Sequence, residues 1–341
     1  MTKRSKKILC ALMAGVILCL CFCSCGGKKI ESFSLPTRAL AENAEEKSYS
    51  TFKYKTYDDG AIIITAYTGS DTSLIIPDKI DGSPVVELAE DLFSDNTSLK
   101  SVKIGKYVEI IGAYCFYGCT ALVSLDIPSG VWFIGNSAFR GTPWIDSQTA
   151  EFVIVGDGVL IKYQGSSAYV EIPDNVKHIS DAFKESLTLK GVNMGPSVLT
   201  VGPYAFAFCP YLRDIEFGEN LVYVGDCAFL ECELITSLIL PDKLEKIGES
   251  AFMYCIAITN IRMGNGLKEI GDYAFARSTH VRIIYMPKSV QSVGYSAFLE
   301  LYYLENVFYE GSEEELAALE IDTSNYSFLD AKKVYGAKKG A

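Results

Sequence analysis

Cysteine is the residue type in this sequence with the widest capacity for chemistry, through disulfides, metal binding or nucleophilic attack. The chain has eleven cysteines, and five of them fall within the first 25 residues. Four of the others stand three residues after a phenylalanine: Cys119, Cys209, Cys232 and Cys255. Other phenylalanines have Asn, Ser or Thr at that place. We therefore interpret it as a small, inward position whose polar atom meets a backbone group.

These four thiols are expected to be buried and free. Side chains that stack in parallel register do not readily reach disulfide torsions. The sequence has no CxxC pair of the kind that holds structural zinc, so no metal site is predicted. Cys115 is expected to be buried as well, which leaves Cys227 as the most reactive thiol.

Catalytic motifs are missing from the sequence. The two histidines, His178 and His280, are far apart and form no Ser-His-Asp or Cys-His arrangement. Asp157 and the run Asp58-Asp59-Gly60 lack the alternating acidic ligands of calcium loops, so we interpret both as turns. The sequence predicts neither an enzyme nor a cofactor.

Phenylalanine marks an internal repeat that must position all of these residues. Seven of the eight intervals between successive marker positions are 23 residues, and the interval from Phe139 to Phe183 is 44. A period this regular predicts a solenoid, in which each coil buries its apolar edge against its neighbours. The markers are Phe93, Phe116, Phe139, Phe183, Phe206, Phe229, Phe252, Phe275 and Phe298.

Each repeat is typical of a strand, a turn, a second extended piece and a helical turn. Residues 122–127 alternate apolar and polar side chains, as a half-buried strand does, and Pro128 ends that strand. We predict a right-handed, β-rich α/β stack of about ten 23-residue coils. It should have one sheet of short parallel strands, short helical or 3-10 turns on the other side, and a continuous spine of phenylalanine rings.

The pattern LxxIxIPxxVxxIGxxAFxxC, as in LITSLILPDKLEKIGESAFMYC, resembles the BspA-type leucine-rich repeats of bacterial surface proteins. The resemblance runs from about Thr51 to Tyr335. It implies a leucine-rich-repeat solenoid displayed on the cell surface for adhesion, and it supplies no catalytic residues.

The repeat pattern also predicts the domain boundaries. Residues 51–93 should form an N-terminal hairpin cap and a first repeat, and residues 94–308 the repeats, with a hairpin-bearing insertion at about 143–170. Residues 309–341 should form a C-terminal cap and tail. A capping box of Ser312 and Glu315 predicts a short helix in that cap.

The first 24 residues have the pattern of a secretion signal. A basic start precedes an apolar run from Ile8 to Cys23, which is short for a membrane-spanning helix. The following Ser24-Cys25-Gly26 resembles a bacterial lipobox, which predicts lipidation at Cys25; simple cleavage and release of a secreted protein is the alternative. Residues 25–50, polar and charged, are interpreted as a flexible tether.

The charge of the chain restricts its partners. Its formal net charge is −11, and removal of the four basic residues at the start makes it about −15. Nucleic acids and anionic bilayers require Lys and Arg clusters, so we expect no nucleic-acid partner and membrane contact only through the lipid anchor. We expect a monomer.

The outward residue of each predicted strand indicates where a partner would bind, because solenoids bind on their concave strand face. This row is charged or polar in the N-terminal coils. Toward the C-terminus it becomes apolar and aromatic, the composition of protein-interface anchors. The candidate ligand-binding residues are Ile239, Arg262, Ile283, Tyr285 and Phe308.

A protein or glycoprotein on host or neighbouring cells is the expected ligand of this surface. One alternative is that the C-terminal cap covers the aromatic row and that the protein is a surface spacer or scaffold. A third reading is glycan capture near Tyr169, Glu171 and Asn193.

Overall fold

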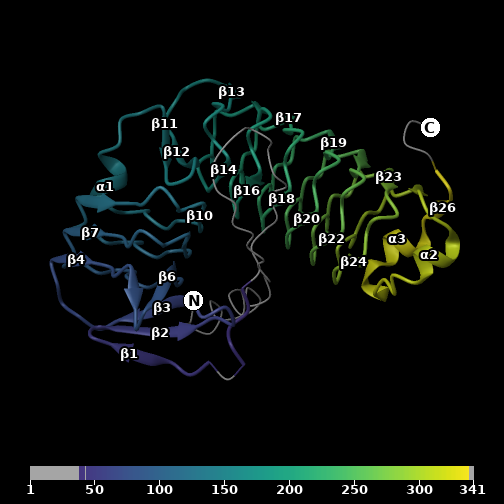
Figure 1. Cartoon of the computed structure of the whole chain (residues 1–341). Coiled ribbons are helices and arrows are strands. Elements are labelled where there is room, and N and C mark those ends of the chain that lie inside the picture. Colours follow the sequence, from purple (N-terminus) through teal and green to yellow (C-terminus); the bar gives the residue numbers. More distant parts are fainter. Residues whose placement is uncertain (1–37, 43, 338–341) are drawn as a thin grey trace, which may run out of the picture.

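The computed structural model describes residues 38–42 and 44–337, which form a curved solenoid (Figure 1). The predicted signal segment, Cys25 and the first part of the predicted tether lie outside the described residues. Among the described residues, no helix combines the length and apolar character that a membrane span requires.

Two rows of short strands run the length of the stack, where the sequence predicted one sheet. The outer row consists of three parallel sheets and has eleven strands within the described residues. They are β4 (Ser73–Ile75), β7 (Ser101–Lys103), β9 (Ser124–Asp126), β13 (Tyr169–Glu171), β15 (Gly191–Asn193), β17 (Asp214–Glu216), β19 (Ser237–Ile239), β21 (Asn260–Arg262), β23 (Ile283–Met286), β25 (Asn306–Tyr309) and β26 (Lys332–Val334).

The inner row comes from the second extended piece of each repeat. Two residues per coil are enough to pair in parallel with the coils on either side, which the single-sheet prediction missed. The row holds β6 (Ser83–Leu88), β8 (Ile110–Ile111), β10 (Phe133–Ile134), β12 (Val159–Tyr163), β14 (His178–Ile179), β16 (Thr200–Val201), β18 (Tyr223–Val224), β20 (Lys246–Ile247), β22 (Glu269–Ile270) and β24 (Ser292–Val293).

The third side of each coil is a turn, where the sequence predicted short helical or 3-10 turns. Residues two before and two after the marker phenylalanine have positive φ, as at Tyr204 (φ 60) and Phe208 (φ 60), with the exception of Asp181 before Phe183. This left-handed backbone interrupts a helix and turns alternate N–H groups toward the next coil. Phe206 N, for example, donates to Ala228 O at 2.8 Å.

The phenylalanine spine is present but interrupted once. From Phe183 to Phe298 the rings stack in register, with Phe206 and Phe229 at 5.1 Å and 2°. At the long interval, Phe139 packs against Trp144 and Phe183 against Tyr163. Phe328 of the C-terminal cap stacks on Phe298 at 4.8 Å and closes the spine.

Both ends are capped. At the N-terminus, β1 (Lys47–Tyr49), β2 (Phe52–Thr56) and β3 (Ile62–Tyr67) pair antiparallel, β3 then pairs parallel with β6, and β5 (Lys79–Ile80) pairs antiparallel with β6. At the other end lie α2 (Glu313–Ala317), a 3-10 turn (Thr323–Asn325) and α3 (Tyr326–Asp330). The capping box of Ser312 and Glu315 forms as predicted.

The cap begins earlier than residue 51, so the predicted tether boundary at 50 is corrected. β1 pairs with β2, and Leu40 bridges to Tyr57. Arg38 forms ion pairs with Asp59 at 2.8 Å and with Glu109 at 3.0 Å. These pairings were not predicted because the segment is polar. A charged edge strand has few apolar residues, so it lacks the alternating pattern by which a strand is recognised in a sequence.

The insertion bends the solenoid. It contains α1 (Pro143–Asp146) and β11 (Phe152–Val155), which forms a hairpin with β12. β12 pairs with β14 and so begins the second part of the inner row, without pairing with β10; in the outer row the insertion separates β9 from β13. Figure 1 accordingly shows β13, β17, β19 and β23 along the outer edge of the arch and β14 to β24 along its inner edge.

Candidate functional site

The outward side chains of β19 to β25 form the C-terminal patch, defined as Ile239, Arg262, Ile283, Tyr285 and Phe308. In-register pairing aligns Ile239 with Arg262, Arg262 with Tyr285, and Tyr285 with Phe308. Because parallel strands lie about 4.8 Å apart, equivalent side chains of neighbouring coils touch. Pairing register therefore brings together residues that are 23 positions apart in the sequence.

A cation and two rings stack along this patch. The Tyr285 and Phe308 rings are parallel to within 14°, with centroids 4.9 Å apart. The Arg262 guanidinium lies 4.9 Å from the centre of the Tyr285 ring on its other side. Each partner stiffens the next, so the groups are held ready to contact a ligand at a low entropic cost.

The patch is accessible, although unevenly. The side chain of Ile239 is 67% exposed, whereas Arg262, Ile283, Tyr285 and Phe308 are half-buried. Ile283 lies between Asn260 and Asn306 of the neighbouring strands, at the polar margin of the patch. The patch thus combines an exposed aliphatic residue with a partly packed aromatic stack.

The C-terminal segment lies beside the stack. β26 pairs with β25 and places Val334 next to Phe308 in the outer row. Ala337 then binds Tyr309 through a backbone hydrogen bond of 3.1 Å. A hollow of about 30 Å³ opens between this segment and the stack, lined in part by Asn265 and Glu310. The cap extends the patch by one strand and leaves the stack half-exposed.

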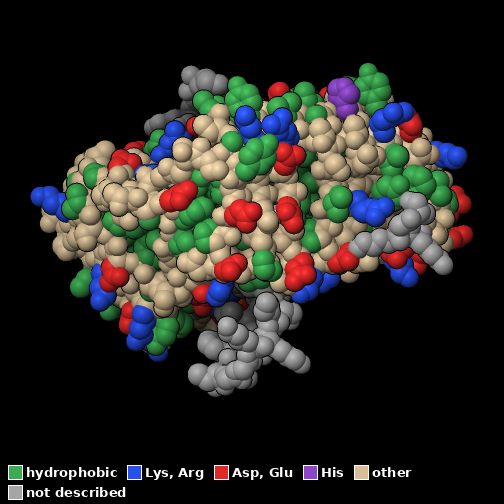
Figure 2. All heavy atoms as spheres, turned by 90° about the horizontal axis from the view of Figure 1, so that it is seen from above, with side chains coloured by type: hydrophobic (Ala, Val, Ile, Leu, Met, Phe, Trp, Pro, Cys, Tyr) green, Lys and Arg blue, Asp and Glu red, His purple; other side chains and the backbone are tan. Residues whose placement is uncertain are grey.

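The position of the patch corrects the prediction of a concave site. It belongs to the outer row, which lies along the outer edge of the bend (Figure 1). Figure 2 shows this face: acidic side chains dominate its middle, and apolar side chains gather toward the C-terminal end. Repeat periodicity identifies the residues that point out of a coil, whereas the direction of bending depends on the insertion.

The cysteines of the repeats act in packing, as predicted from their spacing. The thiols of Cys119, Cys232 and Cys255 donate to the backbone oxygen of the marker phenylalanine one coil earlier, 26 residues before each cysteine, at 3.0–3.2 Å. Ser278 makes the same bond at 2.9 Å, and Cys209 reaches Phe183 O at 3.1 Å. All six described cysteines are free, and Cys115 is buried.

Cys227, predicted as the most reactive thiol, is half-buried. Burial raises its pKa to about 11, so the unreactive thiol form dominates at neutral pH. Of the two histidines, His178 is buried beside Thr200 and His280 is exposed against Tyr303. The described residues contain no group of three or more His, Cys, Asp and Glu side chains that could hold a metal ion.

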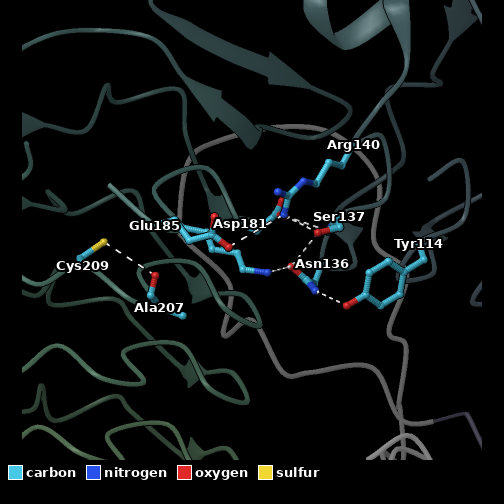
Figure 3. Close-up of polar contacts among 9 residues, drawn as sticks. Tyr114, Asn136, Ser137, Arg140, Asp181, Glu185, Ala207 and Cys209 are labelled. Atoms are coloured by element: carbon cyan, nitrogen blue, oxygen red, sulfur yellow. Dashed lines mark hydrogen bonds and ion pairs between the residues drawn. The ribbon is translucent and has the colours of Figure 1, made fainter. Parts of the chain in front are cut away.

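Sequence reasoning missed a second feature, a cavity of about 260 Å³ beside the insertion. It lies between the turns that contain Phe139 and Phe183, and Figure 3 shows the polar contacts around it. Asp181 is half-buried there and accepts a hydrogen bond from Ser137 N at 2.7 Å; the removal of water from its carboxyl group raises its pKa. The 44-residue interval was the signal that could have located this cavity.

Comparison with known proteins identifies the repeat. The family model of the BspA type leucine rich repeat region matches residues 86–213 and 200–319 in six copies. No curated protein matches the chain.

Several solved structures are similar to the chain over most of its length. A leucine rich cell surface protein from Faecalibacterium prausnitzii is 20% identical, over 82% of this chain and 98% of that one, with a TM-score of 0.38. A leucine-rich repeat protein from Bacteroides ovatus is 18% identical (85% and 99% covered, TM-score 0.29), and the pneumococcal vaccine antigen PcpA is 15% identical (81% and 95% covered, TM-score 0.42).

Proposed function

The chain belongs to the BspA type leucine rich repeat family, and on this premise we propose that it is a cell-surface binding protein whose C-terminal patch holds a protein or glycoprotein ligand. The observation that carries the proposal is the half-exposed stack of Arg262, Tyr285 and Phe308. Stacked aromatic residues next to arginine are the commonest anchors of protein interfaces.

Display outside the cell is part of the proposal. The basic start, the apolar run and Cys25 together support export and lipid anchoring, with a host or neighbouring cell carrying the ligand. The acidic outer face suits a protein partner better than a nucleic acid or an anionic bilayer.

The spacer alternative requires the aromatic row to be covered. The half-exposed stack, with β26 at its side, favours binding instead. One observation favours glycan capture. The Tyr169 side chain is 56% exposed on the same face and lies next to Gly191, its partner in the neighbouring strand. A sugar could stack on such a ring, but Tyr169 has no aromatic partner in the outer row comparable to the Tyr285–Phe308 pair.

A capture experiment tests the proposal. The protein is immobilised and incubated with biotin-labelled surface proteins of epithelial cells, and the retained proteins are compared with those of two variants. Joint replacement of Tyr285→Ser and Phe308→Ser should abolish capture, because it removes both rings. Tyr169→Ser removes an exposed ring from another strand of the outer row; this variant is the matched control and should capture normally. Capture that survives the double replacement contradicts the assignment, and loss only with Tyr169→Ser favours the glycan alternative.

A further inference from the structure

On the side of the solenoid that carries the phenylalanine spine, backbone hydrogen bonds join successive turns in a regular series, the turn ladder. The N–H of the marker phenylalanine and the N–H two residues later donate to carbonyl oxygens of the next turn. Phe116 N binds Ala138 O at 2.8 Å, and Gly118 N binds Arg140 O at 2.9 Å. The same pair of bonds is donated by the turns at Phe93, Phe183, Phe206, Phe229, Phe252 and Phe275.

The ladder stops at the turn of Phe139. Neither Phe139 N nor Gly141 N donates a hydrogen bond to any residue that the structure describes. On the far side of the cavity, Lys184 O likewise accepts none from the described residues, although its counterpart Ala207 O accepts from Glu185 N at 2.8 Å. These two donors and this acceptor all belong to residues that line the cavity.

The insertion explains the gap. Trp144 and Tyr163 replace the missing phenylalanine in the spine, each with its ring centroid about 5 Å from its neighbour. The insertion restores one backbone bond of the ladder as well, because Tyr163 N donates to Ala182 O at 3.4 Å, but it supplies no acceptor for the turn of Phe139 and no donor for Lys184 O. Asp181 satisfies Ser137 N at 2.7 Å, which leaves the next two donors, Phe139 N and Gly141 N.

The C-terminal cap shows how this chain closes a ladder. Ser324 Oγ accepts from Ser296 N at 2.8 Å, and Asn325 Oδ1 accepts from Phe298 N at 2.9 Å. At the cap, a side chain reaches the marker phenylalanine; at the insertion, none does. Backbone N–H and C=O groups that line a cavity are expected to bind a hydrogen-bond partner, because native proteins pair nearly all of their buried backbone polar groups.

The chemistry of the cavity indicates its occupant. Ile145 and Ile161 line it with apolar surface, and Arg140 lies 3.9 Å from Glu185 at its rim, so that the two charges offset each other. A single anion would therefore meet no excess positive charge. An extended polypeptide offers carbonyl oxygens two residues apart on one edge and N–H groups on the other.

We propose that this gap is a second binding site, which takes one extended segment of a partner polypeptide as the missing member of the turn ladder. Its carbonyl groups accept from Phe139 N and Gly141 N, an N–H group donates to Lys184 O, and a small apolar side chain packs on Ile145 and Ile161. The site is independent of the C-terminal patch.

Amide hydrogen exchange of the free protein, followed by NMR, is the first test. Phe139 and Gly141 should exchange much faster than Phe116 and Gly118, which hold the same places in an intact turn. Equal protection at the two pairs would show that the ladder is closed and would overturn the proposal.

Binding is then tested with a peptide from the chain's own extended piece, SVLTVG (residues 197–202), as the probe, which offers valine as the small apolar side chain. At about ten times its Kd, exchange at Phe139 and Gly141 should slow about tenfold, because only the free tenth of the protein exchanges. Exchange at Phe116 and Gly118 should not change. A peptide with reduced amides in place of the two carbonyl groups should give no protection.

Two outcomes contradict the proposal. If N-acetylglycine protects both amides as well as the peptide does, the gap is a carboxylate pocket. If the peptide protects neither, the gap holds only solvent. Ala182→Trp, which fills the cavity, should abolish protection by the peptide, and unchanged exchange at Phe206 and Phe208 verifies that this variant keeps its fold.

Discussion

At the residue scale, the stacked phenylalanines make the largest single contributions to the core. Phe229 lies between Phe206 and Phe252, with its ring centroid 5.1 Å from each and its side chain fully buried. Neighbouring coils share each ring, so a truncation opens a cavity that the rigid backbone ladder on the same side cannot close.

Phe229→Ala is therefore expected to lower the free energy of unfolding by about 3–5 kcal/mol. Urea unfolding followed by circular dichroism measures it. Leu234→Ala, an exposed side chain a few residues further on, should cost far less. Similar losses for the two variants would mean that the spine is not the stabilising core.

His178 makes the stability depend on pH. Burial removes water from its charged form and lowers its pKa to about 4, and Lys177 adds to this effect while Asp157 opposes it. In the unfolded chain the pKa is about 6.5, so the unfolded state binds the proton first as the pH falls. The stability is therefore complete above about pH 6.5 and decreases as the pH falls toward 4.

The loss from this single residue between pH 7 and pH 4 should be about 3 kcal/mol. Urea unfolding at a series of pH values should show a shallower pH dependence for His178→Gln than for the unsubstituted chain. This difference isolates the histidine from acids such as Asp181, whose raised pKa acts in the opposite direction. Parallel pH profiles for the two chains would contradict the assignment.

At the element scale, the turns and the C-terminal cap determine how the stack ends. Positive φ at the second residue on either side of the marker phenylalanine directs alternate N–H groups along the stack. Asn325 receives the N–H of Phe298 and donates to Gly294 O at 3.2 Å, so one buried side chain closes the last turn.

Asn325→Ala should cost about 1–3 kcal/mol, because it leaves a buried backbone donor without an acceptor. Amide exchange at Phe298 should rise with it. Ser312→Ala removes the N-cap of α2 instead and should destabilise by about 1 kcal/mol while leaving exchange at Phe298 unchanged. Slow exchange at Phe298 in the Asn325 variant would show that other groups close the ladder.

Much of this element structure could be predicted from the sequence. The 23-residue period located the strands, the phenylalanine spine and the thiols that bind backbone oxygens, because each depends on contacts that repeat in every coil. The turn geometry could not be predicted, since Tyr204 and Phe208 are not of the residue types that usually adopt a left-handed backbone. The early start of the N-terminal cap was missed because Arg38 and β1 bind through polar groups alone.

At the scale of the whole molecule, the site depends on both register and bending. In-register strands placed Arg262, Tyr285 and Phe308 together as the sequence predicted. The predicted concave position was wrong, because the arch bends toward the inner row and the patch belongs to the outer row (Figure 1). The irregular interval between Phe139 and Phe183 also contains the gap in the turn ladder.

The central claim, that the C-terminal patch binds a protein ligand, is tested most directly by the Kd of the captured ligand, measured by calorimetry with the unsubstituted chain and with each variant. Removal of the Tyr285 and Phe308 rings should weaken binding about 30-fold or more, the change for a hot spot of about 2 kcal/mol. Tyr169→Ser should leave the Kd within about twofold, as expected for a residue outside the hot spot. A Kd unchanged by the loss of both rings would contradict the account.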